Sequence, residues 1–200
     1  HGEWPACMRF DLIVGDRRWR VQTGFVGTLM LTNVLAALSV VHAIGHDLDR
    51  AVAELERLAP IRNRQGIVTG RDQHTYFVDT YKAALWSTGL IVADMANWGP
   101  ARRILVLGDM SDVGHDQGRK YRRVLRQAAE TADLVIATGA SASRATGVGM
   151  PGKVVAAPTV EDVRAVLATQ PPSLVLLKGN NSFRLGGVVP SPVTAPLAAV

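Results

Sequence analysis

The sequence is short of cysteine and of the signals that mark secretion or phosphate binding. Its one cysteine, Cys7, excludes an intramolecular disulfide and favours a reducing, cytoplasmic location. The N-terminal stretch has neither the basic end nor the apolar run of a signal peptide. It also lacks an initiator Met, so we expect the chain to begin inside a longer gene product or to follow a processed tag. The phosphate-loop pattern G-x-x-x-x-G-K-[ST] occurs nowhere in the 200 residues.

The composition is otherwise that of an ordinary globular protein. Apolar residues make up 48% and charged residues 20%, so the chain is neither disordered nor fibrous and can bury a core of normal size. The net charge is +5, and the densest basic run, from Arg119 to Arg126, is typical of a solvated helix face. Because no aromatic platform or recognised binding motif accompanies this run, we expect no nucleic-acid partner.

One segment, from Gly24 to Gly45, contains no Asp, Glu, Lys or Arg and is long enough to cross a bilayer. Polar residues such as Thr32, Asn33 and His42 interrupt it. We therefore expect a soluble helix that is buried over most of its surface, and no membrane span.

The first sixty residues carry the signals of a hairpin and two helices. Gly15-Asp16 is a turn signal between two stretches in which apolar and polar residues loosely alternate. Asp47 is a good N-cap, and Pro60 ends the helix that follows it. This part is too short to bury a full domain core, and the polar, Arg-rich residues 60–72 predict a domain boundary. The predicted elements are strands over 9–14 and 19–25, a helix over 29–44 and a helix from Asp47 to Pro60.

From residue 75 onward, short apolar runs alternate with helical patterns. A continuous apolar run suits a strand whose sheet is covered by helices on both faces. The alternation predicts an α/β fold with a mostly parallel sheet and helices on both faces. Residues 189–200 are rich in Pro and Ala and are expected to form a flexible tail. The predicted strands are 75–78, 104–107, 134–137, 154–156 and 174–177, and the predicted helices are 83–97, 117–131 and 160–168.

Ligands of parallel sheets meet the carboxyl ends of the strands. The sequence therefore predicts a candidate site from the residues that follow its strands. An acid in such a place can also cap the next helix, and for the two acids here capping stays an alternative. The candidates are Asp79, Gly108-Asp109, Gly139 and Lys178-Gly179.

Two other patterns imitate binding motifs. The stretch from Gly147 to Gly152 fits G-x-G-x-x-G, but it does not open a helix after a strand and Pro151 spoils the turn, so we expect a loop. His42 and His46 are four residues apart, yet Gly45 lies between them and no acid completes an H-E-x-x-H zinc site. We expect no metal site, and Cys7 has no basic partner to activate it.

Several short motifs resemble those of Mur ligases, most of all the branch that adds D-alanyl-D-alanine to a UDP-muramoyl tripeptide. Leu107-Gly108-Asp109-Met110 resembles the Leu-Gly-Asp-Met of that branch. The stretch from Val78 to Leu85, followed by Ser87, falls where the branch has Asp-Asp-Ser-Tyr-Asn-Ala-Asn-Pro and then Ser. Asp79, Tyr81, Ala83 and Ser87 match this pattern, whereas Lys82, Ala84 and Leu85 depart from it.

Three further stretches extend the resemblance from about Arg9 to Val188. Leu177-Lys178-Gly179, with Ser182 and Arg184, resembles the Val-Lys-Gly-Ser-Arg loop of the family. Arg64 lies as far upstream of the Val78 motif as the hinge arginine of the family does. The third stretch resembles the end of Gly-x-His-Asn-x-x-Asn-x-x-Ala-Ala: Gly27, Asn33 and Ala36-Ala37 match, and Leu29 and Met30 replace the His and the first Asn.

The resemblance implies an organisation into domains. Mur ligases have a UDP-substrate domain, a central ATPase domain and a Rossmann-like C-terminal domain. Residues 1–62 would be the end of the central domain, residues 63–188 the C-terminal domain, and 189–200 the tail.

The resemblance also implies a reaction. In this family ATP phosphorylates a carboxylate to an acyl phosphate, and an amine then attacks it. The protein supplies orientation, Mg²⁺ and positive charge at the phosphates. The implied cofactors are ATP and Mg²⁺ in the complete enzyme. The implied substrates are a UDP-muramoyl peptide and an amino acid or dipeptide, used in peptidoglycan precursor synthesis.

The resemblance implies binding roles for individual residues. It implies no catalytic residue within these 200 residues. The nucleotide would be bound by Asn33, Arg64, Asp79 and Tyr81, and the substrate by Asp109, Lys178, Ser182 and Arg184.

A second hypothesis is a Mur-ligase-derived domain that has lost catalysis and serves as a binding or interaction module. The replaced His, Asn and Pro positions and the missing phosphate loop favour it. Under either hypothesis the 200 residues alone should make no amide bond, and a separate chain with the ATPase domain is a candidate partner.

Overall fold

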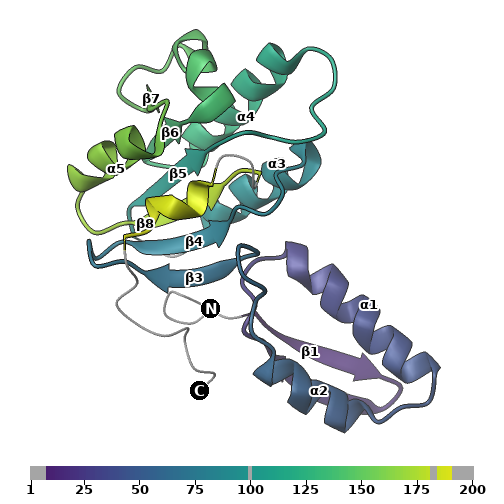
Figure 1. Cartoon of the computed structure of the whole chain (residues 1–200). Coiled ribbons are helices and arrows are strands. Elements are labelled where there is room, and N and C mark those ends of the chain that lie inside the picture. The colour runs from purple at the N-terminus through teal and green to yellow at the C-terminus, as the bar shows by residue number, and fades with distance from the viewer. Residues whose placement is uncertain (1–7, 99–100, 181–183, 191–200) are drawn as a thin grey trace. The chain divides into compact units, whose positions relative to one another are not determined.

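The computed structural model describes residues 8–98, 101–180 and 184–190. The predicted tail therefore lies largely outside the described residues. The contacts divide the chain into two compact units, with the division between Ile61 and Arg62. We call them the first and the second unit and describe each by itself (Figure 1).

The first unit opens with the predicted hairpin. Strand β1 (Arg9–Val14) pairs antiparallel with β2 (Arg17–Gln22), and Gly15 turns between them with a φ of 58°. The second strand starts and ends earlier than predicted. The chain leaves the ladder near Gly24, where a Cβ would lie only 2.9 Å from the carbonyl oxygen of Leu58.

Two helices, α1 (Leu29–Ala43) and α2 (Leu48–Arg57), follow as predicted. Asp47 caps α2, because its side chain accepts hydrogen bonds from the backbone N–H groups of Asp49 at 2.8 Å and Arg50 at 3.5 Å. Such caps satisfy backbone donors that the first turn of a helix leaves free.

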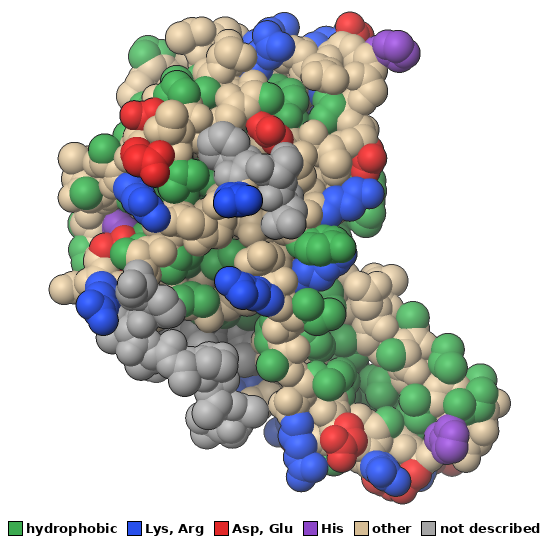
Figure 2. All heavy atoms as spheres, viewed as in Figure 1, with side chains coloured by type: hydrophobic (Ala, Val, Ile, Leu, Met, Phe, Trp, Pro, Cys, Tyr) green, Lys and Arg blue, Asp and Glu red, His purple; other side chains and the backbone are tan. Residues whose placement is uncertain are grey.

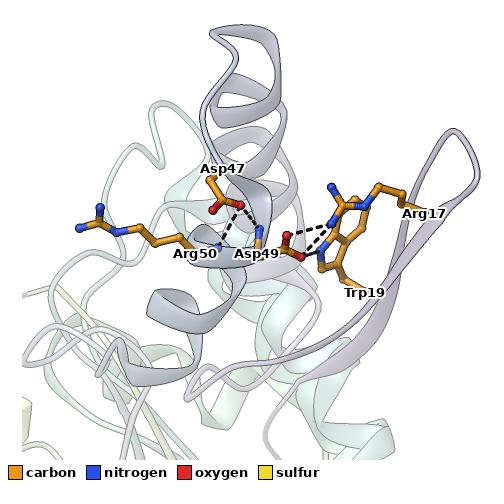
Figure 3. A network of polar contacts seen from close by, with 5 residues as sticks. All are labelled: Arg17, Trp19, Asp47, Asp49 and Arg50. Atoms are coloured by element: carbon orange, nitrogen blue, oxygen red, sulfur yellow. Dashed lines mark hydrogen bonds and ion pairs between the residues drawn. The ribbon is translucent and has the colours of Figure 1, made fainter.

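A polar network joins α2 to β2 (Figure 3). The Asp49 carboxylate accepts a hydrogen bond from Trp19 Nε1 at 2.7 Å and one from Arg17 Nη2 at 2.8 Å. The Arg17 guanidinium lies 4.5 Å from the centre of the Trp19 ring, within cation–π range. Burial is slight here, since both members of the Arg17–Asp49 ion pair are mostly exposed.

The core of the first unit is small and leaves α1 mostly uncovered. Only Val34 and Leu38 of this helix are buried, while Val40 is 58% exposed and Ile44, its C-cap, 62% exposed. The expectation of a helix buried over most of its surface is therefore wrong within this unit. Among the described residues, no helix is long and apolar enough to cross a membrane. The buried core residues are Val21, Val34, Leu38, Leu48, Val52 and Leu55.

The second unit holds the predicted sheet. Six strands run in the order β3-β4-β8-β5-β6-β7. All neighbours pair parallel except β3 and β4. The last strand, β8, inserts between β4 and β5. The strands are β3 (Gly66–Thr69), β4 (Thr75–Asp79), β5 (Arg103–Leu107), β6 (Leu134–Ala137), β7 (Val154–Ala156) and β8 (Leu174–Lys178).

Strand β3 lies where the sequence predicted only a polar boundary segment. It has four residues, of which two, Ile67 and Val68, are apolar, and it forms an edge of the sheet. A short edge strand needs no continuous apolar run, so the pattern was too weak to reveal it.

The helices match the prediction except around α3. Helix α3 (Leu85–Asp94) starts later than predicted and gives way to a 3-10 turn, η1 (Met95–Asn97). Helices α4 (Gln117–Thr131) and α5 (Val160–Ala168) have the predicted bounds. Short 3-10 segments that the sequence did not predict are η2 (Gly139–Arg144), η3 (Thr146–Val148) and η5 (Leu185–Val188).

Helices cover both faces of the sheet, as predicted (Figure 1). Alternate strand residues such as Val106 and Val175 pack on α5 and η5 in one cluster. The residues between them point to the other face; Phe77, for example, packs against Trp98, just after η1, with ring centres 4.7 Å apart. The candidate site lies where the parallel strands end, and several residues there, such as Asp79 and Lys178, are nearly buried.

Candidate functional site

The carboxyl ends of four parallel strands lie side by side at one edge of the sheet. In the register, Asp79 at the end of β4 is opposite Lys178 at the end of β8, and Lys178 is opposite Leu107 at the end of β5. Asp109 and Gly139 follow the ends of β5 and β6. The structure thus brings together candidates that come from four separate stretches of sequence.

Asp79 and Lys178 form an ion pair that the sequence did not predict. Lys178 Nζ donates to Asp79 Oδ2 over 2.6 Å, and the side chains are 2% and 10% exposed. The same ammonium donates to the carbonyl of Lys82 over 2.8 Å. Because paired residues of parallel strands point to the same face, both side chains lie on the α3 side of the sheet. The pair fixes the ends of β4 and β8 and the loop before α3.

Helix capping is not the role of Asp79 in the structure. Helix α3 begins at Leu85, and its N-cap residue, Ala84, has no side-chain hydrogen bond at the cap. Asp79 lies well before this helix and bonds across the sheet to Lys178.

Asp109 holds three segments together. Its Oδ1 accepts a hydrogen bond from the backbone N–H of Ala140 at 2.6 Å, in the first turn of η2. Its backbone carbonyl accepts from the N–H of Asn180 at 2.8 Å. Asp109 therefore caps a 3-10 segment distant in sequence rather than the next helix, α4. The side chain is partly exposed, so a ligand can still reach it.

Gly108 and Gly179 allow the two neighbouring strand ends to approach closely. A Cβ on Gly179 would lie 3.2 Å from Leu185 Cδ2 and 3.5 Å from Gly108 Cα. The N–H of Gly108 also donates to the carbonyl of Lys178 at 2.8 Å. Both glycines stand in motifs singled out from the sequence, and this contact gives each a physical reason.

Tyr121 of α4 supports the loop after β5. Its hydroxyl accepts a hydrogen bond from the N–H of Met110 at 2.7 Å, and the residue is 3% exposed. Burial raises the pKa of this hydroxyl, although the Met110 N–H acts in the opposite direction. Tyr121 therefore stays neutral at physiological pH. Sequence reasoning placed it on a helix but missed this role, for which no local signal exists.

Arg64 and Tyr81 meet on the surface beside this edge. The Arg64 guanidinium lies 4.2 Å from the centre of the Tyr81 ring. The carbonyl of Asn63 accepts hydrogen bonds from the N–H groups of Thr80 and Tyr81 at 3.0 and 3.1 Å, which fixes the segment before β3 against the end of β4. Tyr81 is 52% exposed, so part of its ring is free for a ligand.

A second ion pair, Lys82 with Asp112 at 3.0 Å, links the loop after β4 to the loop after β5. Both side chains are more than half exposed, so the pair adds little stability. Lys82 is one of the positions where the sequence departs from the family pattern. The structure gives it a partner on the neighbouring loop.

Three predicted site residues remain: one lies in the first unit, one lies outside the described residues and one precedes η5. Asn33 is exposed on α1 in the first unit, where its Nδ2 lies 3.7 Å from Met30 Sδ. Ser182 lies outside the described residues. Arg184 is exposed just before η5, with a φ of 48°.

The structure also bears on the patterns that imitate binding motifs. The Gly147–Gly152 stretch contains the end of η3 and a turn before β7, with Gly149 and Gly152 at positive φ, and it opens no helix. It is a loop, as predicted. Among the described residues, no group of three His, Cys, Asp or Glu side chains is placed to hold a metal ion. Lys and Arg are scattered over the face shown in Figure 2 and form no single basic patch there.

Comparison with known proteins gives a family match over the second unit. Residues 63–181 match the family described as Mur ligase, glutamate ligase domain. The chain is 28% identical over 130 residues to the UDP-N-acetylmuramoyl-L-alanyl-D-glutamate–2,6-diaminopimelate ligase of Xylella fastidiosa. That stretch covers 64% of this chain and 26% of the relative.

Solved structures resemble both units. MurF from Acinetobacter baumannii superposes with a TM-score of 0.76 at 23% identity, over 91% of this chain and 41% of that one. MurF from Thermotoga maritima in complex with ADP gives 0.75 at 18% identity, over 90% and 42%. At these identities the likeness concerns the fold. The chain spans about a quarter of the curated relative and about two fifths of these structures.

Proposed function

The chain belongs to the Mur ligase family, and from this we propose that it is the C-terminal part of an ATP-dependent ligase that forms an amide bond. The enzyme would join an amino acid or dipeptide to a carboxylate in peptidoglycan precursor synthesis. The observation that carries the proposal is the family match over residues 63–181, together with the convergence of Asp79, Asp109 and Lys178 at one sheet edge.

The nucleotide side of the proposal rests on Asp79, Arg64 and Tyr81. The described residues donate a hydrogen bond to Asp79 Oδ2 only, so Oδ1 can accept from a ribose hydroxyl. The exposed Tyr81 ring and the Arg64 plane offer apolar and cationic surface beside it. These residues fit the nucleoside end of ATP. The sequence has no loop for the phosphates, so phosphates and Mg²⁺ must be held by another part of the enzyme.

The substrate side rests on Asp109, Ser182 and Arg184. A partly exposed carboxylate can accept from an incoming ammonium, and an exposed guanidinium can pair with a substrate carboxylate. Lys178 is nearly buried and already has two acceptors. We therefore assign it to positioning Asp79 rather than to direct contact with the substrate.

The reaction divides between this chain and the part that holds the phosphates. ATP supplies the phosphoryl group that turns the acceptor carboxylate into an acyl phosphate, with release of ADP. The amine of the second substrate then attacks the acyl carbon, and phosphate and one proton leave. The residues of this chain would orient the nucleoside and the amine, which is the main contribution of a protein to such transfers.

One observation favours the second candidate, an interaction domain without catalysis. Lys82, Ala84 and Leu85 occupy positions that differ from the family pattern, and Lys82 is paired with Asp112. These residues flank the proposed nucleotide site, so a binding role without turnover would tolerate their replacement.

The gene around this sequence decides between the two candidates. A ligase requires a G-x-x-x-x-G-K-[ST] about two hundred residues upstream of His1, or in a second chain. The purified 200 residues alone should release no ADP from ATP. Together with the phosphate-loop part they should release ADP continuously only when both an acceptor and an amino substrate are present. Turnover by the 200 residues alone would refute their dependence on a phosphate-loop part. No turnover by the complete assembly, with any amino acid or dipeptide offered, would refute the ligase assignment.

A further inference from the structure

Helices α3 and α4 of the second unit are neighbours and run parallel (Figure 1). Gln127 Nε2 donates a hydrogen bond to the carbonyl of Gly89 over 3.2 Å. Further along both helices, Thr131 Oγ1 lies 3.4 Å from the carbonyl oxygen of Val92. The buried residues of the two helices pack toward the sheet, so their exposed residues face away from it.

The outward side of α3 is apolar. Its exposed residues are Trp86, Leu90 and Ala93, and we call them the α3 stripe. Their spacing of four and three residues places them on one side of the helix. Trp86 is 70% exposed and Leu90 is 53% exposed. A large aromatic ring thus stands on the surface together with an aliphatic side chain.

The outward side of α4 is basic. Arg119, Arg123, Arg126 and Glu130 are exposed at the same kind of spacing, and we call them the α4 stripe. Arg119 forms an ion pair with Asp116. Arg123 and Arg126 have no ion-pair partner among the described residues. Glu130 is the one acid among the exposed residues of the two helices, so the α4 stripe keeps an excess of positive charge.

The two stripes lie at the same level. Gly89 is level with Gln127, because they are joined by a hydrogen bond. Three residues earlier on both helices, Trp86 is therefore level with the interval between Arg123 and Arg126. Packed helices have axes about 8–10 Å apart. A single flat surface can thus meet the indole ring and both guanidinium groups at once.

A membrane with anionic phospholipids has the chemistry that fits these stripes. Guanidinium groups form paired hydrogen bonds with phosphate oxygens. Basic residues close to an anionic leaflet are attracted to it. Trp is enriched at the boundary between headgroups and acyl chains, and Leu can bury its side chain beside it. Apolar side chains next to a basic stripe are typical of protein surfaces that lie on a membrane.

Two other partners fit less well. Single-stranded nucleic acid is held by several aromatic rings on which successive bases stack, and Trp86 is the one exposed aromatic residue of α3 and α4. A duplex is bound through its phosphates and would leave the α3 stripe unburied. A second copy of the chain would bring the same excess of positive charge to the contact, and like charges repel.

We propose that the α3 and α4 stripes form a peripheral binding surface for anionic phospholipid membranes. Trp86 enters the headgroup region, and Arg123 and Arg126 bind lipid phosphates. None of the candidate site residues belongs to either stripe. Membrane binding is therefore independent of the proposed reaction, and each can be refuted without the other.

Co-sedimentation with vesicles tests the surface. Vesicles of phosphatidylcholine and phosphatidylglycerol should bind the chain, and added salt should release it because screening weakens the attraction. Vesicles of phosphatidylcholine alone should not bind it. Arg123→Gln together with Arg126→Gln should weaken binding by about 30-fold, the combined contribution of two basic residues near an anionic surface. The control, Arg50→Gln together with Arg71→Gln, removes the same charge at exposed positions elsewhere and should bind as the parent chain does.

Fluorescence tests the insertion of Trp86. Vesicles that contain phosphatidylglycerol and acyl-brominated phosphatidylcholine should quench the bound chain. Trp86→Phe should still bind but lose most of the quenching, because the ring that enters the membrane no longer reports. Trp86→Ser should weaken binding by about tenfold, since it removes apolar surface from the contact. Ile13→Ser, at a position that is 66% exposed in the hairpin, is the control and should bind unchanged. Circular dichroism verifies that the variants remain folded.

Four outcomes would overturn the proposal. The first is no binding to anionic vesicles, or equal binding to neutral ones. The second is an equal loss in the two arginine pairs, which would show that net charge alone matters. The third is a loss of binding in Val40→Glu, on the exposed side of α1, with none in the Arg123 and Arg126 pair. The fourth is binding of a single-stranded oligonucleotide, but not of vesicles, that the Arg123 and Arg126 pair abolishes. Nucleic acid would then be the partner.

Discussion

Lys178 Nζ lies 2.6 Å from Asp79 Oδ2, although the two residues are 99 positions apart in the sequence. They meet because β8, the last strand of the chain, inserts beside β4. Both charges are nearly shielded from water. A buried pair of this kind depends on both members, because removing one leaves an uncompensated charge.

Asp79→Asn should therefore destabilise the second unit. Had Asp79 capped a helix, Asn would have replaced it with little loss. Here the substitution leaves the Lys178 ammonium buried with only neutral acceptors, and we expect a loss of about 2–4 kcal/mol in the free energy of unfolding. Urea denaturation followed by circular dichroism measures this. A loss below about 0.5 kcal/mol would mean that the pair contributes nothing measurable.

The matched control removes both charges. Lys178→Met alone leaves the Asp79 carboxylate without its partner and should also destabilise. The double variant Asp79→Asn, Lys178→Met should lose less than the sum of the two single losses, with a coupling of about 1–3 kcal/mol. Additive losses would show that the two side chains act independently.

The fold was largely predictable from the sequence, because its signals are local. Buried parallel strands appear as short apolar runs, and α4 and α5 appear as helical patterns with clear ends. The 3-10 segments and β3 were missed. Each is short, and β3 contains only two apolar residues, Ile67 and Val68.

The candidate site was predictable only residue by residue. The rule for parallel sheets identified Asp79, Asp109 and Lys178 as residues at strand ends. Their contacts depend on strand order, which the sequence alone did not supply. The Asp79–Lys178 pair and the bond from Asp109 to Ala140 both cross between strands or loops distant in sequence. Their roles toward nucleotide and substrate stay predictions.

Gly179→Ala should disturb the contact between the ends of β5 and β8. The added methyl would lie 3.2 Å from Leu185 Cδ2, which is tighter than ordinary packing, and at the ordinary contact distance of 3.5 Å from Gly108 Cα. We expect a loss of about 1–3 kcal/mol in unfolding free energy, which thermal denaturation can detect. Gly187→Ala is the control, because a Cβ there meets nothing within 4 Å. Equal stability of the two variants would contradict the proposed close approach.

Asp49 should titrate below the usual range of an aspartate. The hydrogen bond from Trp19, and then that from Arg17, lower the pKa of its carboxyl from 3.8. Because this pKa is lowered in the folded state, the network contributes its full stabilisation of the first unit above pH 3.8. That stabilisation is lost as the pH falls through the pKa of Asp49 in the folded protein. The Trp19 indole N–H resonance should shift with a midpoint below 3.8, and Asp49→Asn should abolish the shift. A midpoint at or above the ordinary value would show that the network does not persist in solution.

Arg184 should affect the amino substrate and not the fold. It is exposed and adopts a φ of 48°, a conformation that costs a residue with a Cβ some strain and costs glycine none. Arg184→Gly therefore removes the guanidinium while keeping or slightly raising stability. In the complete ligase it should raise KM for the amino substrate by about 10–100-fold, the scale of a lost charge-assisted hydrogen bond, and leave KM for ATP unchanged. Arg184→Lys keeps the charge and should recover part of the lost affinity for the amino substrate. Lys178→Met, in contrast, should lower stability and weaken ATP binding, because it removes the partner of Asp79. If Arg184→Gly left KM for every amino substrate unchanged, the guanidinium would have no part in binding, and the substrate side of the site would have to be sought at Asp109 instead.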